Sequence, residues 1–376
     1  MTRWPHYRGT SRGAIRAAAI AAALTAPLVA AGAVAVASQS GAASPAAPAV
    51  ASCTVQNLPT LGGSYGNVTA AVANGDIVGI AEDTSGIPRA VLWRAGKAEL
   101  IHTGLGGSVP AGINTQGDVV GNSPDGENTV GWVWSPGKLV RLQGAGEMDP
   151  LPAAISNQGV VAGALEPTEG TQAEGDNKPN SLENEQAAVW RSPTAAPKLL
   201  SPLPGDQGAH AFAVSGDGQV GGVSDGGTYR PVVWDLSGTP HALPGLGGGY
   251  GAVRAFGPGG VAVGDAVAKD GTDHAVRWDA DGQITDLGLP PGSRAAQAYG
   301  VLPGGVVVGT AEMPAPSGGV LKQAVRWPAA GTPQLLVGPD GLQQTVVAGA
   351  ASAQTAVGYR TDAKGGRYPV MWWCGR

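Results

Sequence analysis

Four side chains have the residue types and positions expected of a ligand-binding surface. Two segments share the sequence Leu-Gly-Gly-X-Tyr-Gly, which places Tyr65 and Tyr250 at equivalent positions, and a third segment contains Tyr229 followed by Arg230. Exposed tyrosine rings beside an arginine can stack on sugars or anchor a peptide. The alternative is that the tyrosines fill junctions between neighbouring structural repeats. We take these four residues as candidate ligand-binding residues.

Catalytic chemistry has weaker support in the sequence. Acidic side chains that follow predicted strands could serve a secreted carbohydrate-active hydrolase or lyase if they converged on one pocket. The candidates are Asp83, Asp125, Asp225 and Glu312. The four histidines beyond the N-terminal segment, His102, His210, His241 and His274, show no metal-ligand spacing such as His-X3-His. Catalytic residues therefore stay unassigned, and a non-enzymatic protein is the simpler interpretation.

Two acidic segments are compatible with cation binding. Residues 165–186 contain six acidic residues and one basic residue, Lys178. The segment Asp270-Gly271-Thr272-Asp273-His274 offers oxygen ligands at a spacing that calcium tolerates. Neither segment has the regular ligand spacing of an EF-hand, so a solvated acidic loop and a polar turn are the simpler interpretations. We expect no metal site and no cofactor.

A repeat decides which elements position these residues. A tryptophan that follows small and β-branched residues recurs at intervals of 41 to 56 residues. The seven copies are Trp93, Trp134, Trp190, Trp234, Trp278, Trp327 and Trp372. A marker glycine within a Val-rich run keeps step with them, at Gly79, Gly121, Gly163, Gly222, Gly264, Gly309 and Gly358. This period matches one four-stranded propeller blade, so we predict an all-β, seven-bladed β-propeller of antiparallel blades with the tryptophans in its core.

The second repeat illustrates the four strands expected in each blade. Residues 109–114, 118–122, 131–134 and 138–142 alternate in hydrophobicity and are separated by turn sequences. The first strand carries Gly or Ala on one face in every repeat, as at Gly112 and Ala154. Because blades narrow toward the propeller axis, we place this strand innermost. The high content of Gly (62 residues) and Pro (30 residues) agrees with many short strands and tight turns.

The ends of the repeat region predict how the ring closes. Residues 53–58 resemble a fourth strand that precedes the first complete repeat, whereas the last repeat contains three strands. The N-terminal strand should therefore complete the last blade. Alignment of the repeats places Cys53 and Cys374 on either side of the missing turn, within disulfide range. Two unrelated buried thiols are the alternative, but a pair in an exported chain favours a Cys53–Cys374 disulfide.

The N-terminal region predicts export. Residues 1–37 carry four arginines and no acidic residue, followed by an Ala-rich apolar run, which is typical of a secretory signal peptide. An uncleaved membrane anchor is the alternative. Residues 38–52 are interpreted as an Ala/Pro/Ser-rich spacer, and residues 53–376 as the propeller. Loss of the four arginines changes the net charge from −5 to −9, which argues against nucleic acid or an anionic membrane as the main partner.

The repeat sequences resemble the HAF-repeat family of predicted extracellular bacterial proteins. The matching pieces are Gly112-Ile113-Asn114, Val119-Val120-Gly121, His274-Ala275-Val276-Arg277-Trp278 and Thr60-Leu61-Gly62-Gly63. The resemblance covers residues 53–376 and implies a repeat architecture and export. It implies no particular activity, because the family has none assigned.

These observations predict a secreted, monomeric binding or interaction module whose partner is an extracellular protein or glycan. A carbohydrate-active hydrolase or lyase with carboxylates at the channel mouth is the main alternative. A structural protein of the cell envelope without a small ligand is a third possibility. Clustered carboxylates around a pocket would favour catalysis, and a flat face lined by tyrosines would favour binding.

Overall fold

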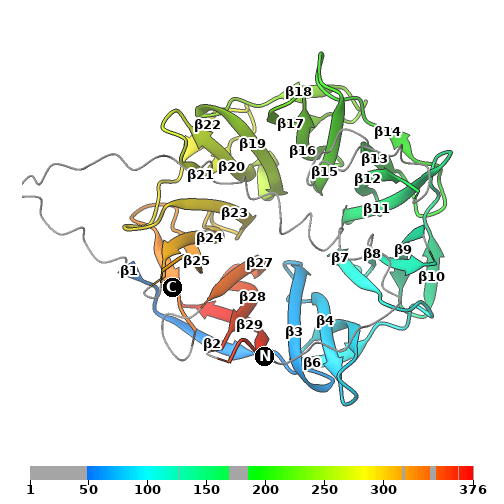
Figure 1. The fold of residues 1–376 in the computed structure, drawn as a ribbon, viewed down its shortest axis with the longest axis horizontal. Coiled ribbons are helices and arrows are strands. Elements are labelled where there is room, and N and C mark those ends of the chain that lie inside the picture. The colour runs from blue at the N-terminus through cyan, green and yellow to red at the C-terminus, as the bar shows by residue number, and fades with distance from the viewer. Residues whose placement is uncertain are drawn as a thin grey trace, which may run out of the picture.

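The computed structural model of the chain describes residues 49–126, 128–168, 185–315, 318–338, 344–362 and 364–375. In these residues seven sheets stand around a central axis, each built on four antiparallel strands, and one of them carries a fifth, parallel strand at its outer edge (Figure 1). The predicted seven-bladed β-propeller is confirmed. The predicted signal peptide and most of the predicted spacer lie outside the described residues. Within the described part of the chain, no helix is long and apolar enough to cross a membrane.

The strands fall into four concentric sets. The innermost are β3 (Gly62–Ala71), β7 (Val109–Ile113), β11 (Met148–Ile155), β15 (Gly208–Val214), β19 (Gly247–Phe256), β23 (Ala295–Val301) and β27 (Thr345–Ser352). The second strands are β4 (Ile77–Asp83), β8 (Val119–Asp125), β12 (Val161–Pro167), β16 (Val220–Asp225), β20 (Ala262–Ala268), β24 (Val307–Pro314) and β28 (Thr355–Thr361). The third strands are β5 (Pro88–Arg94), β9 (Asn128–Ser135), β13 (Gln186–Trp190), β17 (Tyr229–Trp234), β21 (Asp273–Trp278), β25 (Val320–Trp327) and β29 (Arg367–Cys374). The outermost are β6 (Lys97–Leu100), β10 (Lys138–Arg141), β14 (Lys198–Leu199), β18 (Pro240–Ala242), β22 (Ile284–Asp286), β26 (Gln334–Leu336) and β2 (Cys53–Asn57).

We number the blades 1 to 7 from β3 to β27. A short 3-10 turn, Pro258–Gly260, joins the first two strands of blade 5.

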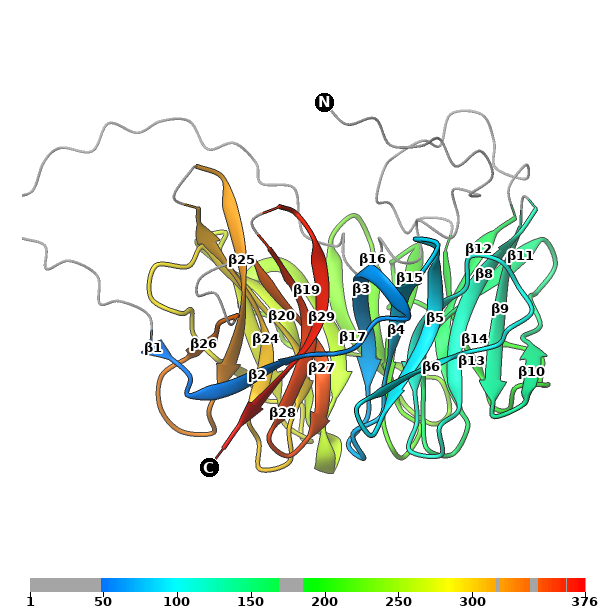
Figure 2. The same ribbon diagram turned by 90° about the horizontal axis from the view of Figure 1, so that it is seen from below.

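The ring closes as predicted. Strand β2 pairs antiparallel with β29 and becomes the fourth strand of blade 7, with Cys53 opposite Cys374. The two cysteines form a disulfide, and their Cα atoms are 4.2 Å apart. Figure 2 shows β2 lying on the outside of the ring across β29.

The closing segment begins earlier than the predicted start of the propeller. Strand β1 (Ala49–Val50) pairs in parallel with β26, at the outer edge of blade 6. Ala51 is buried, and its amide donates to the Leu335 carbonyl oxygen at 2.9 Å. Residues from the end of the predicted spacer therefore pair with blade 6, and the chain then continues into blade 7, where the disulfide lies.

Six of the seven repeat tryptophans lie in the core as predicted. Their side chains are at most 3% exposed, and each indole Nε1 donates to a backbone carbonyl in the connection that enters its blade. For example, Trp93 donates to Pro59 at 2.6 Å and Trp278 donates to Pro244 at 2.8 Å. Because the bond joins the third strand to the inter-blade connection, it holds each blade to the preceding one.

Trp134 packs against the hydrophobic core as predicted, but it is less buried than the other six tryptophans. It is only partly buried, whereas Trp132 on the same face of β9 is fully buried and donates to the Ser123 hydroxyl at 2.9 Å. Other blades have Ala or Val at the position of Trp132. The larger Trp132 ring fills this space in blade 2, so Trp134 is less buried than its counterparts.

The marker glycines are explained by a β-bulge in every innermost strand. The register of each inner strand shifts by one residue opposite the marker glycine. The shift brings a backbone carbonyl of the inner strand against the glycine. A Cβ atom on Gly264 would lie 1.9 Å from the Ala252 carbonyl oxygen, and one on Gly358 would lie 1.8 Å from that of Val346. Only glycine fits opposite the bulge.

Candidate binding site in the central channel

The four predicted ligand-binding residues lie at blade junctions and do not line the central cavity. Tyr65 accepts a hydrogen bond from Arg367 of blade 7 at 3.3 Å. Tyr250 packs edge-to-face on Tyr229 of blade 4, with ring centroids 5.6 Å apart. Arg230 binds Asp206 through two hydrogen bonds of 2.6 and 3.1 Å. The structure thus brings two of the four together and gives all four contacts across or beside a junction; their role in ligand binding stays a prediction.

The predicted carboxylates do not converge. Asp83 pairs with Arg89 at 2.9 Å, and Asp125 pairs with Arg141 at 3.0 Å. Asp225 accepts a hydrogen bond from the Gly227 amide in its own turn. These three residues belong to blades 1, 2 and 4. Glu312 in blade 6 is the one of the four that lines the central cavity.

The two segments considered for cations differ in what the structure describes. Most of the acidic insertion 165–186 lies outside the described residues. In the other segment, Asp270 accepts a hydrogen bond from the Thr272 amide, and His274 pairs with Asp286 at 2.9 Å. Among the described residues no three His, Cys, Asp or Glu side chains cluster as a metal site.

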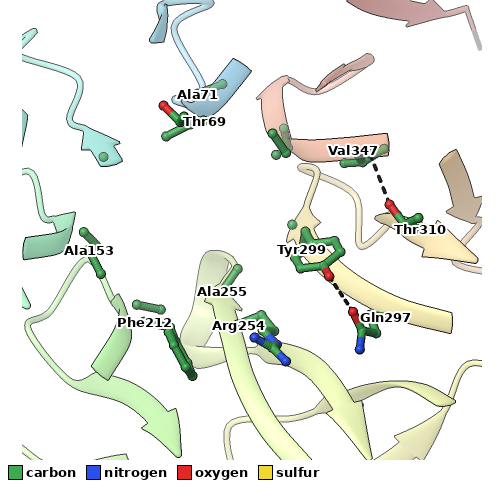
Figure 3. A pocket seen from close by; sticks show the side chains of 18 of the residues that line it. Thr69, Ala71, Ala153, Phe212, Arg254, Ala255, Gln297, Tyr299, Thr310 and Val347 are labelled. Carbon is green, nitrogen blue, oxygen red and sulfur yellow. Dashed lines mark hydrogen bonds between the residues drawn. The ribbon is translucent and has the colours of Figure 1, made fainter. Parts of the chain in front are cut away.

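A cavity of about 1330 Å³ occupies the channel and is lined by all seven innermost strands. The residue at the centre of each bulge lines this cavity, ten positions before the marker glycine. In chain order these bulge residues are Thr69, Ala111, Ala153, Phe212, Arg254, Tyr299 and Ala348. The wall is therefore asymmetric. Blades 4 to 6 present two aromatic rings and a guanidinium, and the other four blades present small side chains. Figure 3 shows Arg254 and Tyr299 across the cavity from Thr69.

Arg254 and Asp265 form a buried ion pair in this wall. Their side chains are 5% and 0% exposed, and Arg254 Nε lies 2.7 Å from Asp265 Oδ1. The guanidinium also stands 5.2 Å from the centroid of the Phe212 ring, which is within the range of a cation–π contact. Burial disfavours the charge of Arg254, but Asp265, with smaller contributions from Tyr299 and Tyr250, more than offsets this and raises the pKa of Arg254 above its ordinary value.

Next to this pair, three polar side chains form a chain of hydrogen bonds. The Tyr299 hydroxyl donates to Gln297 Oε1 at 2.5 Å, and Gln297 Nε2 donates to Asp273 Oδ2 at 2.9 Å. Burial, with a further contribution from the charge of Asp265, raises the pKa of Asp273 to about 8. The Asp273 carboxyl is therefore protonated at neutral pH, where it can donate as well as accept a hydrogen bond.

The carboxyls of Asp265 and Asp273 are close because of strand register. Asp265 is opposite Ala275 in the β20–β21 pair, and Asp273 is two residues before Ala275. The two side chains thus share one face as diagonal neighbours. Asp265 Oδ2 and Asp273 Oδ1 are both buried without a hydrogen-bond partner. When Asp273 is protonated, the two neighbouring carboxyls do not carry two negative charges side by side.

A testable consequence concerns stability and pH. Because the pKa of Asp273 is raised from 3.8 to about 8 on folding, the native state holds a proton that the unfolded state has lost between these pH values. Stability should therefore decrease as pH rises through this interval, by at most about 1.4 kcal/mol per pH unit. We expect Asp273→Asn to gain stability relative to wild type progressively from pH 5 to pH 8, measured by chemical denaturation.

Asp270→Asn is the matched control for this experiment. A hydrogen bond from the Thr272 amide lowers the pKa of Asp270, so its protonation affects stability only below pH 4, outside the measured interval. A constant difference between Asp273→Asn and wild type over the whole range would contradict the raised pKa.

The remaining lining groups on this side form further pairs. His210 Nδ1 lies 2.6 Å from the Glu185 carboxylate, and the His210 ring stacks on Phe212 with centroids 4.7 Å apart. Glu312 lies 3.9 Å from Lys322. Blades 4 to 6 thus combine aromatic rings with hydrogen-bonding groups, and this arrangement can hold a polar ligand.

No protein-family model matches the sequence, and no curated protein matches it. Among solved structures, the chain is similar to a mutant of puromycin hydrolase complexed with PGG, with a TM-score of 0.53 and 16% identity over 84% of this chain and 54% of that one. It is also similar to a prolyl endopeptidase, with a TM-score of 0.52 and 14% identity over 82% of this chain and 50% of that one. A putative TolB from Agrobacterium tumefaciens matches with a TM-score of 0.42 and 15% identity, over 70% of this chain and 89% of that one. The chain spans about half the length of the first two proteins. At these identities the likeness concerns the propeller fold alone.

Proposed function

We propose that this protein is an exported binding module whose ligand occupies the central channel against the wall formed by blades 4 to 6. The asymmetric ring of bulge residues carries the proposal. Small side chains are sufficient to form the bulge, as Ala111, Ala153 and Ala348 show in blades 2, 3 and 7. Three adjacent blades instead carry Phe212, Arg254 and Tyr299, and a buried polar network supports them.

Export is supported by the disulfide and by the N-terminal sequence. Disulfides persist in oxidising compartments outside the cytosol, and Cys53–Cys374 joins the two ends of the propeller. The Arg-rich and Ala-rich sequence of residues 1–37 is typical of a signal peptide. The resemblance to HAF-repeat proteins stays a prediction that agrees with this location.

The proposal can be tested by filling the channel. The fold accepts Phe, Arg and Tyr at the bulge position, so Ala153→Trp should fold while its indole occupies the cavity. We expect wild-type protein to bind members of a glycan or peptide array and Ala153→Trp to lose at least about 90% of that signal, which corresponds to a tenfold weaker affinity when the protein concentration is far below Kd. Leu199→Trp is the matched control, because Leu199 is exposed on the outer strand β14. Equal array binding by all three proteins would place the ligand elsewhere.

A carbohydrate-active hydrolase or lyase is the second candidate. Asp273 and Glu312 both line the cavity, and a carboxyl with a pKa of about 8 can act as a proton donor at neutral pH. Release of reducing ends from a bound glycan by wild type, lost in Asp273→Asn, would favour this activity over binding alone.

A further inference from the structure

We infer that the ligand of the channel is an uncharged saccharide of several sugar units. This inference rests on the proposed function and specifies its ligand class. It follows from the pairing of the charged groups in the wall, from the size of the cavity and from the neutral polar groups that line it.

The charged groups of the wall are mostly paired with one another, which disfavours a net charge on the bound part of the ligand. The buried guanidinium of Arg254 is compensated by Asp265, Glu312 has Lys322 beside it, and His210 pairs with Glu185. Asp273 is neutral because of its raised pKa. The other two charged lining residues, Asp270 and Arg294, are exposed and opposite in sign. A carboxylate or ammonium group of a ligand buried here would find no oppositely charged side chain free to pair with it among the described residues of this wall. Burial of an unpaired charge is costly.

The size of the cavity favours an oligomer over a single small molecule. Its volume of about 1330 Å³ exceeds the roughly 300–1,000 Å³ of common small-molecule sites. The four small bulge residues Thr69, Ala111, Ala153 and Ala348 leave this space on one side. The cavity therefore has room for several linked rings.

The polar groups have the chemistry that hydroxyls need. The amide of Gln297, the protonated carboxyl of Asp273, the Tyr299 hydroxyl and the Thr310 hydroxyl are neutral groups, each able to donate and accept hydrogen bonds. Phe212 belongs to the same wall, with His210 stacked on its ring and the Arg254 guanidinium 5.2 Å from its centroid. A pyranose ring has hydroxyls around its edge that both donate and accept hydrogen bonds, so it matches a wall of neutral groups that do the same. An extended peptide would instead offer alternating side chains to a wall without matching pockets.

The test is isothermal titration calorimetry of the purified protein with matched trisaccharides. The probes are neutral trisaccharides of glucose, xylose and mannose, the same trisaccharides ending in a uronic acid or an amino sugar, and end-capped neutral tripeptides. We expect at least one neutral trisaccharide to bind, and its acidic and amino forms to bind at least about tenfold more weakly. The affinity should change by less than about twofold between roughly 50 and 500 mM salt, because no net charge is buried.

Two variants locate the binding. Tyr299→Phe removes one hydroxyl and should weaken saccharide binding about three- to tenfold with an unchanged unfolding midpoint. Tyr368→Phe removes a hydroxyl that donates to Asp362 outside the cavity, and this variant should bind as wild type does. Tighter binding of a charged form, or binding of no saccharide in the panel, would overturn the saccharide inference. Peptide binding that Ala153→Trp abolishes would overturn it too and leave the channel as the site. Saccharide binding that neither Ala153→Trp nor Tyr299→Phe affects would overturn both proposals.

Discussion

Gly264→Ala is expected to destabilise the propeller by about 3 kcal/mol or more, at the upper end of the costs of overpacked substitutions. The added Cβ would lie 1.9 Å from the Ala252 carbonyl oxygen. Neither group belongs to a flexible side chain, so the clash can be relieved only if β19 and β20 separate at the bulge. This movement would also disturb the Arg254–Asp265 pair, because Arg254 is the bulged residue and Asp265 is next to Gly264.

Chemical denaturation of the two variants Gly264→Ala and Gly106→Ala would measure this effect. Gly106 is exposed, and a Cβ atom added to it would have no neighbouring atom within 4 Å, so Gly106→Ala should be close to neutral. If the two variants had equal free energies of unfolding, the account of the marker glycines through the bulge would be wrong.

Removal of the disulfide has the second large expected effect. The bond closes a loop with a sequence separation of 321 residues, and its loss should cost up to roughly 5 kcal/mol in the chain-entropy treatment. We expect the double variant Cys53→Ser/Cys374→Ser to unfold at lower denaturant concentration. In this variant β2 should open first, because β2 is the edge strand of its sheet and β29 is its one neighbour there.

The free energy of unfolding and amide exchange in β2 and β29 would be measured for wild type with and without reductant and for the double variant. Reduced wild type should match the variant in both measurements. Equal stability of oxidised wild type and the variant would show that strand pairing alone closes the ring. Protection of β26 against exchange should change less, because β26 retains its antiparallel partner β25.

The repeat and the closure could be predicted from the sequence because both depend on local spacing. The tryptophan and glycine periods follow directly from one blade per repeat, and the aligned ends of the chain place Cys53 beside Cys374. Trp134 shows where spacing is insufficient. It has the right position in the repeat, but the neighbouring Trp132 fills the core space. Competition between two side chains for the same volume within one blade cannot be read from the spacing of the tryptophans.

The channel wall formed by Phe212, Arg254 and Tyr299 could not be located from alternation alone. In a regular strand, successive side chains face opposite sides, but a bulge interrupts this alternation. The direction of Arg254 or Tyr299 therefore becomes clear only when the bulge is known. A signal was present nonetheless, since the residue ten positions before each marker glycine is Thr, Ala, Ala, Phe, Arg, Tyr and Ala in blades 1 to 7. The predicted tyrosines lie at junctions instead, because the segments that carry them pack against the preceding blade.

The most direct test of the central claim is a crystal structure of the protein with the array compound that binds best. We expect density for the compound inside the channel, with hydrogen bonds to Gln297 or Tyr299 and with the Phe212 ring in contact. Density on the outer strands or in a blade junction beside Tyr250, with the channel filled by solvent, would contradict a ligand site in the centre of the ring.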